Sequence, residues 1–491
     1  MEMKKALLNE YEVRKNKLLE LRTRIIPYAN KFERTHTLIE ATQLKDGDES
    51  AVCGRIIFKR SFGKFMFIKL WDLTGVFQIS CSCNEIEDSI YNELKNSIDV
   101  GDFIGARGIV YRTKTGELTL KTLHYEILSK ALRPLPEKFH GLSDPDTRYR
   151  HRYLDLICNQ TTRDVFIKRS KTIQFIRNFL NENGFLEIET PILQTVASGA
   201  AAKPFMTKHN ALDLDLFMRI APELYLKQAI TGGFDRVFEI GKNFRNEGMD
   251  ASHLQEFTML EWYSAYWDFN DNIDFTRSLL LELLDTVYGS RVVEFDGHTI
   301  DFNAEWKKIN YCSAVSDLIQ SNILDYTELD DLKAVIKKYE LLNKDELDKS
   351  SSIPALIDLL YKQKIRPYII QPVILYNYPA CLIPLARRND QDSRIIDMFQ
   401  LVVCGWEIVK AYSELIDPEI QRENFMEQAK NKYNGDDEAF EIDNDFLLAM
   451  EHGMPPMSGV GVGIDRLVAM LCNQPTLRDV VLFPTMKPEV Q

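Results

Sequence analysis

The sequence lacks several features that would set it apart from ordinary globular proteins. It has no run of eighteen or more apolar residues, and its charged start, MEMKKALLNEYEVRK, does not join a basic segment to an apolar one. We therefore expect an intracellular, cytoplasmic protein without a membrane partner. No internal repeat stands out, and a composition of 45% hydrophobic and 27% charged residues excludes collagen-like and globally disordered chains.

Cysteine is also scarce for a secreted protein. Eight cysteines are scattered between Cys53 and Cys472, which does not make a disulfide framework and indicates a reducing compartment. Only Cys81 and Cys83 are close together, and in a strand they would point to the same face. Without two further ligands nearby, we interpret them as strand thiols rather than as a metal site.

A net positive charge is missing as well. With 60 basic and 73 acidic side chains the chain has a formal charge of −13, which argues against a protein that coats nucleic acid, and we expect no DNA partner. The first 70 residues nevertheless contain 15 Lys and Arg against 9 Asp and Glu, a balance of +6. This asymmetry indicates an amino-terminal part that faces a polyanion, although a solvated helix face explains it equally well.

What is present indicates an α+β chain with two main domains. Residues 4–26 have the apolar spacing of an amphipathic helix, and residues 1–45 form the expected basic helical extension. Five short β-rich runs within 46–135 fit a small closed barrel of the OB type, whose open face commonly holds single-stranded nucleic acid. Residues 136–158, with several Pro and Arg, form the expected linker. Residues 159–491 form the expected second domain, with a helical insertion at about 312–370, whose charged stretch near 330–352 we expect to lie on the surface.

A segment rich in groups that handle nucleotides spans 238–269. Arg245 and Glu247 flank a predicted turn, and His253 leads into a strand. Alternation along this strand places the charged Glu261 on a face with apolar residues, where a carboxylate is costly unless it meets a cation. A cationic ligand and a buried ion-pair partner both remain open. The residues on this face are Phe257, Met259, Glu261 and Tyr263.

A second alternating segment spans 404–418. If the strand is regular, Glu407 lies on one face, and Lys410, Tyr412 and Glu414 lie on the other. Two acids on opposite faces indicate two separate roles rather than one salt bridge.

The segment 457–484 contains Gly459, Gly461 and Gly463 directly before Arg466 and an apolar helix. The spacing does not match the G-x-G-x-x-G fingerprint of dinucleotide-binding folds. We expect these glycines to let a base lie flat against the backbone, with Arg466 at the helix start to meet phosphate.

Several segments resemble the motifs of one enzyme family. Motif 1 of that family, a dimer-forming helix and strand, is similar to FLNENGFLEIETPIL; motif 2 is similar to FRNEGMDASHLQEFTMLE, and motif 3 to GVGVGIDRL. More specific are ASGAAAKPFMTKHNALDLDLFMRIAPELYLK, the connector RPLPEKFHGL, and YSEL followed by DP. Over nearly its whole length the chain resembles the class II aminoacyl-tRNA synthetases, and among them the lysine–tRNA ligases of bacterial type.

The resemblance implies a fold, a reaction and partners. The fold is an OB barrel followed by a catalytic domain on a mostly antiparallel sheet flanked by helices, in a homodimer. The reaction is the ATP-dependent activation of L-lysine and its transfer to tRNA(Lys), with Mg²⁺ as the metal.

The resemblance also implies roles for individual residues. Arg245 and Arg466 would supply the catalytic positive charge, and Glu407 would hold the metal. The amino acid would be bound by Gly199, Glu223, Arg245, Glu261, Tyr263, Lys410, Tyr412 and Glu414; ATP by Arg245, Glu247, His253, Phe257, Glu407, Gly463 and Arg466; and the anticodon by Phe67, Gln78 and Glu117.

Five positions depart from the family pattern. Gln400 occupies the position of a glutamate that helps to hold magnesium, and Lys410 that of an asparagine near the amino acid's carboxylate. An amide is a poorer ligand for a hard cation than a carboxylate, so the metal site should be weakened. Because the two changes together raise the local charge by two units, we hypothesise that the Lys410 ammonium substitutes for a magnesium ion near the phosphates. Ser252 replaces an arginine, Tyr412 a phenylalanine and Ile416 an asparagine.

Three functions are consistent with the sequence. The first is a lysine–tRNA ligase, which the presence of the three anticodon positions favours. The second is a synthetase-like paralogue for another amino acid or acceptor, which Lys410 favours. The third is a non-catalytic RNA-binding protein with a decayed active site.

Overall fold

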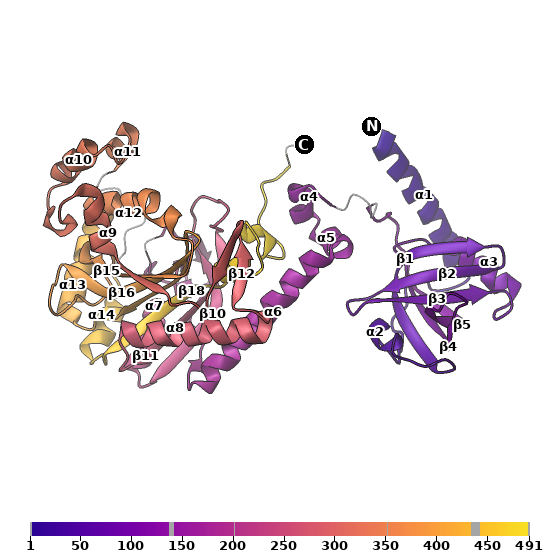
Figure 1. Cartoon of the computed structure of the whole chain (residues 1–491). Helices are drawn as coiled ribbons and strands as arrows, with labels where there is room; N and C mark the ends of the chain where they lie inside the picture. Colours follow the sequence, from indigo (N-terminus) through magenta and orange to yellow (C-terminus); the bar gives the residue numbers. More distant parts are fainter. Residues whose placement is uncertain (1, 137–141, 201, 351, 434–441, 490–491) are drawn as a thin grey trace. The chain divides into compact units, whose positions relative to one another are not determined.

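The computed structural model consists of two compact units, residues 1–143 and 144–491 (Figure 1). Residues 137–141 of the expected linker lie outside the described residues, and the part from Pro145 onward forms two short helices of the second unit. No helix in the described ranges is both long and apolar enough to cross a bilayer. These ranges are 2–136, 142–200, 202–350, 352–433 and 442–489.

The first unit is a closed five-stranded barrel with three helices, which confirms the predicted barrel. Its elements are α1 (Glu2–Arg22), α2 (Leu38–Ala41), β1 (Glu49–Phe62), β2 (Phe65–Trp71), β3 (Val76–Ser82), α3 (Asp88–Ser97), β4 (Phe103–Arg112) and β5 (Leu118–Ser129). The strands follow the order β1-β2-β3-β5-β4. Met66, Ile68 and Leu70 of β2 are fully buried while the residues between them are partly exposed, because alternate side chains of a strand point to opposite faces.

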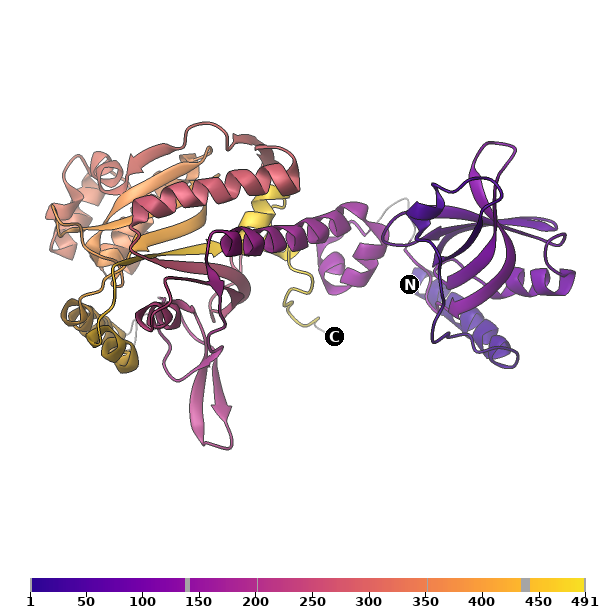
Figure 2. The ribbon, with the colours of Figure 1, turned by 90° about the horizontal axis from the view of Figure 1, so that it is seen from below.

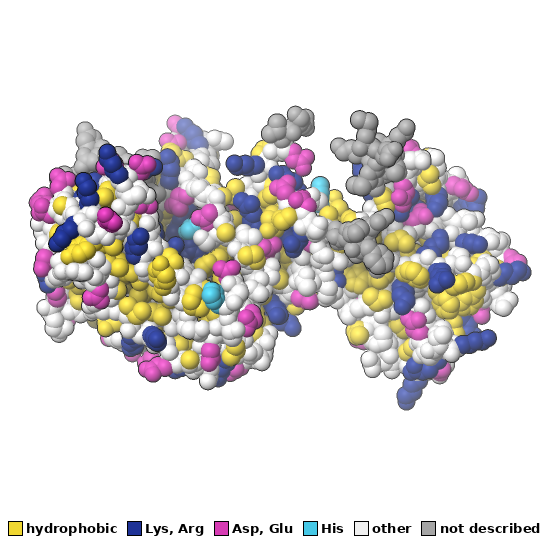
Figure 3. Space-filling model, turned by 45° about the horizontal axis from the view of Figure 1, so that its top comes forward, with side chains coloured by type: hydrophobic (Ala, Val, Ile, Leu, Met, Phe, Trp, Pro, Cys, Tyr) yellow, Lys and Arg dark blue, Asp and Glu magenta, His cyan; other side chains and the backbone are white. Residues whose placement is uncertain are grey.

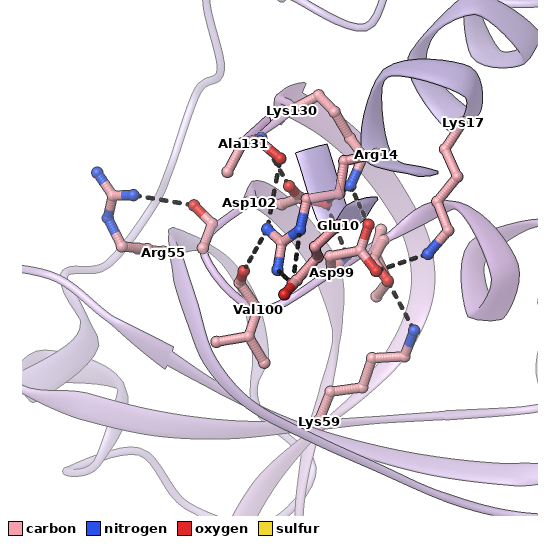
Figure 4. Close-up of polar contacts among 12 residues, drawn as sticks. Glu10, Arg14, Lys17, Arg55, Lys59, Asp99, Val100, Asp102, Lys130 and Ala131 are labelled. Carbon is pink, nitrogen blue, oxygen red and sulfur yellow. Dashed lines mark hydrogen bonds and ion pairs between the residues drawn. The ribbon is translucent and has the colours of Figure 1, made fainter. Parts of the chain in front are cut away.

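Ion pairs hold α1 on the barrel (Figure 4). Arg14 is nearly buried and donates a hydrogen bond to the backbone carbonyl of Val100 at 3.0 Å. Lys17 pairs with Asp99 at 2.6 Å, and the buried Lys130 pairs with the same carboxylate at 2.5 Å. Part of the basic face of this helix is therefore used inside the unit. Lys and Arg side chains also lie among hydrophobic ones on the face of this unit drawn in Figure 3.

The second unit is built on an eight-stranded sheet, in which only the two edge strands pair in parallel with their neighbours. This confirms the predicted mostly antiparallel sheet. The sheet strands are, in spatial order, β14 (Lys307–Asn310), β15 (Val373–Pro379), β16 (Ile395–Val403), β17 (Trp406–Ser413), β18 (Met457–Gly463), β11 (Glu256–Ala265), β10 (Arg236–Phe244) and β6 (Leu186–Glu187). Two smaller sheets contain β7 (Leu193–Gln194), β8 (Met206–His209) and β9 (Leu214–Met218), and β12 (Val292–Phe295) and β13 (His298–Asp301).

Helices cover both faces of the large sheet. The helices are α4 (Pro145–Arg150), α5 (Arg152–Cys158), α6 (Gln160–Glu182), α7 (Glu223–Thr231), α8 (Phe269–Leu283), α9 (Tyr311–Ile319), α10 (Leu329–Lys338), α11 (Lys344–Lys349), α12 (Ile353–Lys364), α13 (Pro418–Tyr433), α14 (Asn444–Glu451) and α15 (Ile464–Leu471). On one face α6 and α8 lie side by side (Figure 2) and pack, with α15, on a core that contains the fully buried Trp262. On the other face α7, α9, α12 and α14 form a second core around Tyr263.

The region expected as an insertion, about 312–370, is helical as predicted but is not confined to the surface. Leu332 and Ile336 of α10 and Leu356 and Leu360 of α12 are fully buried. These side chains join the core on the second face of the sheet. The charged residues between them had indicated a more peripheral position.

Candidate active site

The central strand β18 presents glycines where its neighbours carry side chains. In the register of the sheet, Gly461 lies between Glu261 of β11 and Lys410 of β17. Gly459 and Gly463 follow two residues away in either direction, on the same face of the strand. The three glycines therefore leave a furrow with a backbone floor between two strands that carry polar side chains.

Gly459 has no room for a side chain. A Cβ atom there would lie 2.2 Å from Cε1 of Tyr263 and 2.5 Å from Oε1 of Glu414. Both distances are far below van der Waals contact, so glycine is required to keep these two groups in place.

A cavity of about 290 Å³ lies over this furrow. Its volume is at the lower end of the range for small-molecule sites. Of the residues predicted for the catalytic site, Glu414 and Gln400 are not in its lining. The predicted residues that line it are Gly199, Glu223, Arg245, Glu247, His253, Phe257, Glu261, Tyr263, Glu407, Lys410, Tyr412, Gly463 and Arg466.

Carboxylates gather at the end of the cavity formed by α7 and the middle of β11. Glu223 begins α7, and its Oε1 accepts a hydrogen bond from the Tyr412 hydroxyl at 2.7 Å. The Tyr412 hydroxyl thus orients a cavity carboxylate. Oε2 of Glu261 accepts a hydrogen bond from the Tyr263 hydroxyl at 3.0 Å. We call this part of the cavity the acidic end.

A lysine that was not predicted from the sequence also lies at the acidic end. Lys227 is fully buried, and its ammonium pairs with Glu223 at 2.6 Å and also with Glu414. The spacing of Glu223 and Lys227, four residues apart on one helix, is a local signal that could have been recognised. The partnership with Glu414 joins distant segments and has no local signal.

Burial raises the pKa of two carboxyl groups near the acidic end, those of Glu261 and Glu414. The pKa of Glu261 is raised to about 8, first by burial and then by the nearby Glu223 carboxylate, while hydrogen bonding from Tyr263 opposes the shift. Burial also raises the pKa of Glu414, and Lys227 opposes that rise. These carboxylates are therefore short of positive charge in the ligand-free protein.

Arg466 lies at the opposite end of the cavity, which we call the basic end. It belongs to the first turn of α15, and its guanidinium donates hydrogen bonds to the backbone carbonyls of Ser252 and Glu407, both at 3.2 Å. A further contact joins Nη2 to Nε2 of His253 at 2.9 Å. Arg466 is thus oriented by neutral groups and keeps its charge available to an anion.

Arg245 lies beyond the end of β10, and its guanidinium lies over the ring of Phe257 at 5.2 Å. Its Nε is enclosed and has no hydrogen-bond partner among the described residues. Burial lowers the pKa of Arg245, and Glu247 opposes that shift. An enclosed guanidinium with a spare donor is suited to an anionic ligand.

Regular alternation along β17 wrongly placed Glu407 on the face opposite Lys410. The pairing of β16 with β17 shifts register next to Val402, which pairs with Glu407. This bulge adds a residue to one strand, so Glu407 and Ile408 both line the cavity together with Lys410.

The residues near Glu407 do not fit a metal held by two protein carboxylates. Gln400 is the cross-strand partner of Lys410, and its buried Oε1 accepts a hydrogen bond from the Tyr378 hydroxyl at 2.7 Å. That oxygen is engaged, and Gln400 is absent from the cavity lining. Within the described ranges no group of three or more His, Cys, Asp and Glu side chains could hold a metal ion.

Of the three predicted anticodon residues, Phe67 lies on β2 and Gln78 on β3, and Glu117 directly precedes β5, which neighbours β3. Phe67 contacts Phe65 edge to face, with ring centroids 4.8 Å apart. Gln78 is largely buried and donates a hydrogen bond to Thr119 at 2.9 Å. Glu117 pairs with Lys69 at 3.0 Å, and Lys69 is the cross-strand partner of Gln78. The three positions therefore belong to one region of the barrel.

Comparisons with known proteins agree with these observations. Residues 144–487 match the family model of tRNA synthetases class II (D, K and N), and residues 51–128 match that of the OB-fold nucleic acid binding domain. A lysine–tRNA ligase of Pectobacterium carotovorum is 43% identical over 494 residues, which cover 98% of this chain and 97% of that protein. One of Escherichia coli K12 is 42% identical over 493 residues, with the same coverage. The chain belongs to the class II tRNA synthetases of the D, K and N group and, within it, to the lysine–tRNA ligase family.

Proposed function

We propose that this protein activates L-lysine with ATP and transfers the lysyl group to the 3′ end of tRNA(Lys). The observation that carries this proposal is a single cavity with carboxylates at one end, two guanidiniums at the other and a glycine furrow between them. A diamino acid matches the acidic end, and a triphosphate matches the basic end.

In the first step, a carboxylate oxygen of lysine attacks the α-phosphorus of ATP. The new oxygen–phosphorus bond replaces the bond to the leaving pyrophosphate, and the product is lysyl-adenylate. Two anions approach each other, so fixed positive charge is needed where charge gathers in the transition state. Arg245 and Arg466 supply that charge, and Phe257 and Gly463 offer flat surfaces to the adenine.

In the second step, a ribose hydroxyl of the tRNA attacks the carbonyl carbon of the adenylate. An ester bond forms, AMP leaves, and the hydroxyl proton is lost. Positioning accounts for this step, because the mixed anhydride is already activated.

At the acidic end, we assign Glu223 and Gly199 to the α-ammonium group of lysine, and Glu261, Tyr263 and Glu414 to the side-chain ammonium. Removing the partner of a buried charge costs about 2 to 5 kcal/mol. A substrate without the distal ammonium, such as norleucine, should therefore be rejected.

ATP–pyrophosphate exchange with a panel of amino acids tests this function. We expect exchange with lysine and none with norleucine. Exchange with a different amino acid alone would identify a paralogue with altered specificity. Exchange with no amino acid would identify a non-catalytic RNA-binding protein.

We further propose that the Lys410 ammonium takes the place of a protein-held magnesium ion. Lys410 lines the cavity, and among the described residues its ammonium has no carboxylate partner of the kind that Lys227 has. Its cross-strand neighbour Gln400 already accepts a hydrogen bond from Tyr378. Magnesium then enters only as the counter-ion of ATP.

The role of Lys410 can be tested by replacing both Gln400 and Lys410. The double variant Gln400→Glu/Lys410→Asn should bind more Mn²⁺ per chain than the unmodified protein in the presence of an unreactive ATP analogue, as counted by electron paramagnetic resonance. Its exchange activity should also require free Mg²⁺ beyond that chelated by ATP. Equal numbers of bound Mn²⁺ ions in the two proteins would contradict the proposal that the Lys410 ammonium takes the place of a magnesium ion.

We propose that the barrel reads the anticodon through Phe67, Gln78 and Glu117. Base stacking on an aromatic ring is worth about 1 to 3 kcal/mol, so Phe67→Ala should weaken charging of tRNA(Lys) about fivefold or more. Pyrophosphate exchange should stay unchanged because it needs no tRNA. Equal losses in both assays would contradict separate tasks for the two units.

We also propose a cytoplasmic homodimer. The segment that resembles the dimer-forming motif corresponds to the end of α6, β6 and the residues up to Leu193. Sedimentation equilibrium should give twice the chain mass of 56.9 kDa, and a monomer would refute this assignment.

A further inference from the structure

The ion pairs of Lys227 differ from the buried ion pair between Arg219 and Glu239 in the same unit. Arg219 and Glu239 pair one to one at 2.5 Å, and their charges cancel. Lys227 instead meets two carboxylates, Glu223 and Glu414. A pair that only stabilises the fold has no need of a second, unbalanced carboxylate, because an excess of buried charge is costly.

The Lys227 ammonium is fixed from several sides. Besides the two carboxylates, it lies over the ring of Tyr412 at 5.6 Å and over the ring of Phe446 at 5.9 Å. Both rings present their electron-rich faces to a cation at this distance. Burial lowers the pKa of Lys227, but Glu223 and Glu414 together outweigh that effect and raise it. The ammonium therefore stays protonated.

The charges of the acidic end are not balanced by Lys227 alone. Three carboxylates, those of Glu223, Glu261 and Glu414, are at most 6% exposed as whole residues, and one ammonium faces them. Fully ionised, the group has a charge of −2. Lysine has two ammonium groups, and its carboxylate belongs at the basic end beside Arg245.

We infer that Lys227 is a positioning residue for lysine recognition, which fixes the Glu223 and Glu414 carboxylates through its two ion pairs and balances one of the three carboxylates at the acidic end, so that the two ammonium groups of lysine match the other two. This inference rests on the proposed function. Lys227 does not line the cavity and does not touch the substrate. It acts through Glu223, which lines the cavity, and through Glu414, which pairs with it.

Removal of the Lys227 charge should impair lysine binding specifically. In Lys227→Met the three carboxylates lose their shared cation, so one of them takes up a proton and no longer accepts a substrate ammonium. The KM for lysine in pyrophosphate exchange should rise at least tenfold at pH 7, with the KM for ATP within twofold. Lys227→Arg, which keeps the positive charge, should recover most of the loss at pH 7.

A second comparison remains informative even if Lys227→Met fails to fold. Glu414→Gln leaves two carboxylates and Lys227, a charge of −1, whereas Lys227→Met/Glu414→Gln has a charge of −2. The double variant should therefore bind lysine at least threefold more tightly than Glu414→Gln, as measured by titration calorimetry. A purely structural role of Lys227 predicts equal or weaker binding.

A matched control is available in the same sheet. Lys242 of β10 pairs with Glu256 at 3.4 Å on the surface, so Lys242→Met should change neither KM. A folded Lys227→Met protein with a lysine KM within twofold of the unmodified protein would overturn the inference. If the unmodified protein shows no exchange with lysine, the proposed function fails instead.

Discussion

The two ends of the cavity carry charge in different ways. At the acidic end, Glu223 and Glu414 have a partner within the protein, and Lys227 balances only part of their charge. At the basic end, Arg466 is held by backbone carbonyls, and Nε of Arg245 has no partner among the described residues. The acidic end thus already contains a cation of the protein, whereas the guanidiniums at the basic end remain available to bind an anion.

This difference matters for catalysis because the two ends serve different states of the reaction. The ammonium groups of lysine keep their charge throughout, so the acidic end contributes equally to the ground state and the transition state and should determine KM. Charge on the phosphates and the attacking carboxylate is redistributed as adenylate forms, so the basic end should determine kcat.

The largest effect is expected at the basic end. Arg466→Met should lower kcat of pyrophosphate exchange about 100- to 1000-fold, the range for losing one preorganised donor to the transition state. The KM for lysine should change little. Arg291→Met is a matched control, because Arg291 pairs with Asp285 on the surface at 2.7 Å. A rise in the KM for lysine with unchanged kcat would contradict the assignment of kcat to the basic end and of KM to the acidic end.

The next largest effect is expected at the acidic end. Glu261→Gln should raise the KM for lysine by roughly 30-fold or more, because a buried ammonium would lose its charged partner at a cost of about 2 kcal/mol or more. Glu256→Gln, on the exposed start of the same strand, is the control. Loss of thermal stability with an unchanged KM would mark Glu261 as a structural ion-pair member.

A pH effect of up to tenfold per unit follows from the raised pKa of Glu261. Since its carboxyl titrates at about 8 in the ligand-free protein, the KM for lysine should fall as pH rises from 6.5 to 8. The effect of pH on stability has the opposite sign. Because burial raises the pKa of Glu261, this group stabilises the folded state at pH values below the ordinary pKa of a glutamate, and that contribution is lost as the pH rises through about 8. If Glu261 causes this pH dependence, the KM for lysine of Glu261→Gln should not depend on pH. A Glu261→Gln protein with the same pH dependence of KM as the unmodified protein would contradict this role of Glu261.

The smallest effect is expected from Tyr412→Phe. This change removes the hydroxyl that donates to Glu223 at 2.7 Å and restores the residue that the family has. A hydrogen bond to a charged group contributes about 1.5 to 3 kcal/mol, and Lys227 still holds Glu223 in this variant, so we expect the lower limit, a rise of about tenfold in the KM for lysine. A lower KM in Tyr412→Phe would show that the hydroxyl competes with the substrate for Glu223.

Local patterns predicted much of the fold and of the site. Five short β-rich runs predicted the barrel, and period-two alternation predicted the cavity face of β11 with Glu261 and Tyr263, because that face depends only on side chains along one strand. The glycines of β18 were recognised from their spacing alone. Motif order indicated the antiparallel catalytic sheet before any register was known.

Two features could not be predicted locally. The bulge in β17 that turns Glu407 into the cavity depends on pairing with β16, which single-strand alternation does not contain. The Lys227–Glu414 pair joins a helix to a strand end far along the chain, and only the folded sheet brings them together. Burial of the insertion around Leu332 was underestimated because its exposed face is highly charged.

A crystal structure with an unreactive lysyl-adenylate analogue tests the two-ended cavity most directly. We predict that its distal ammonium lies within hydrogen-bond distance of Glu261, that its phosphate contacts Arg245, and that Lys227 keeps both carboxylate partners. An analogue bound in the reverse direction, or a distal ammonium in solvent with Glu261 unengaged, would contradict the account.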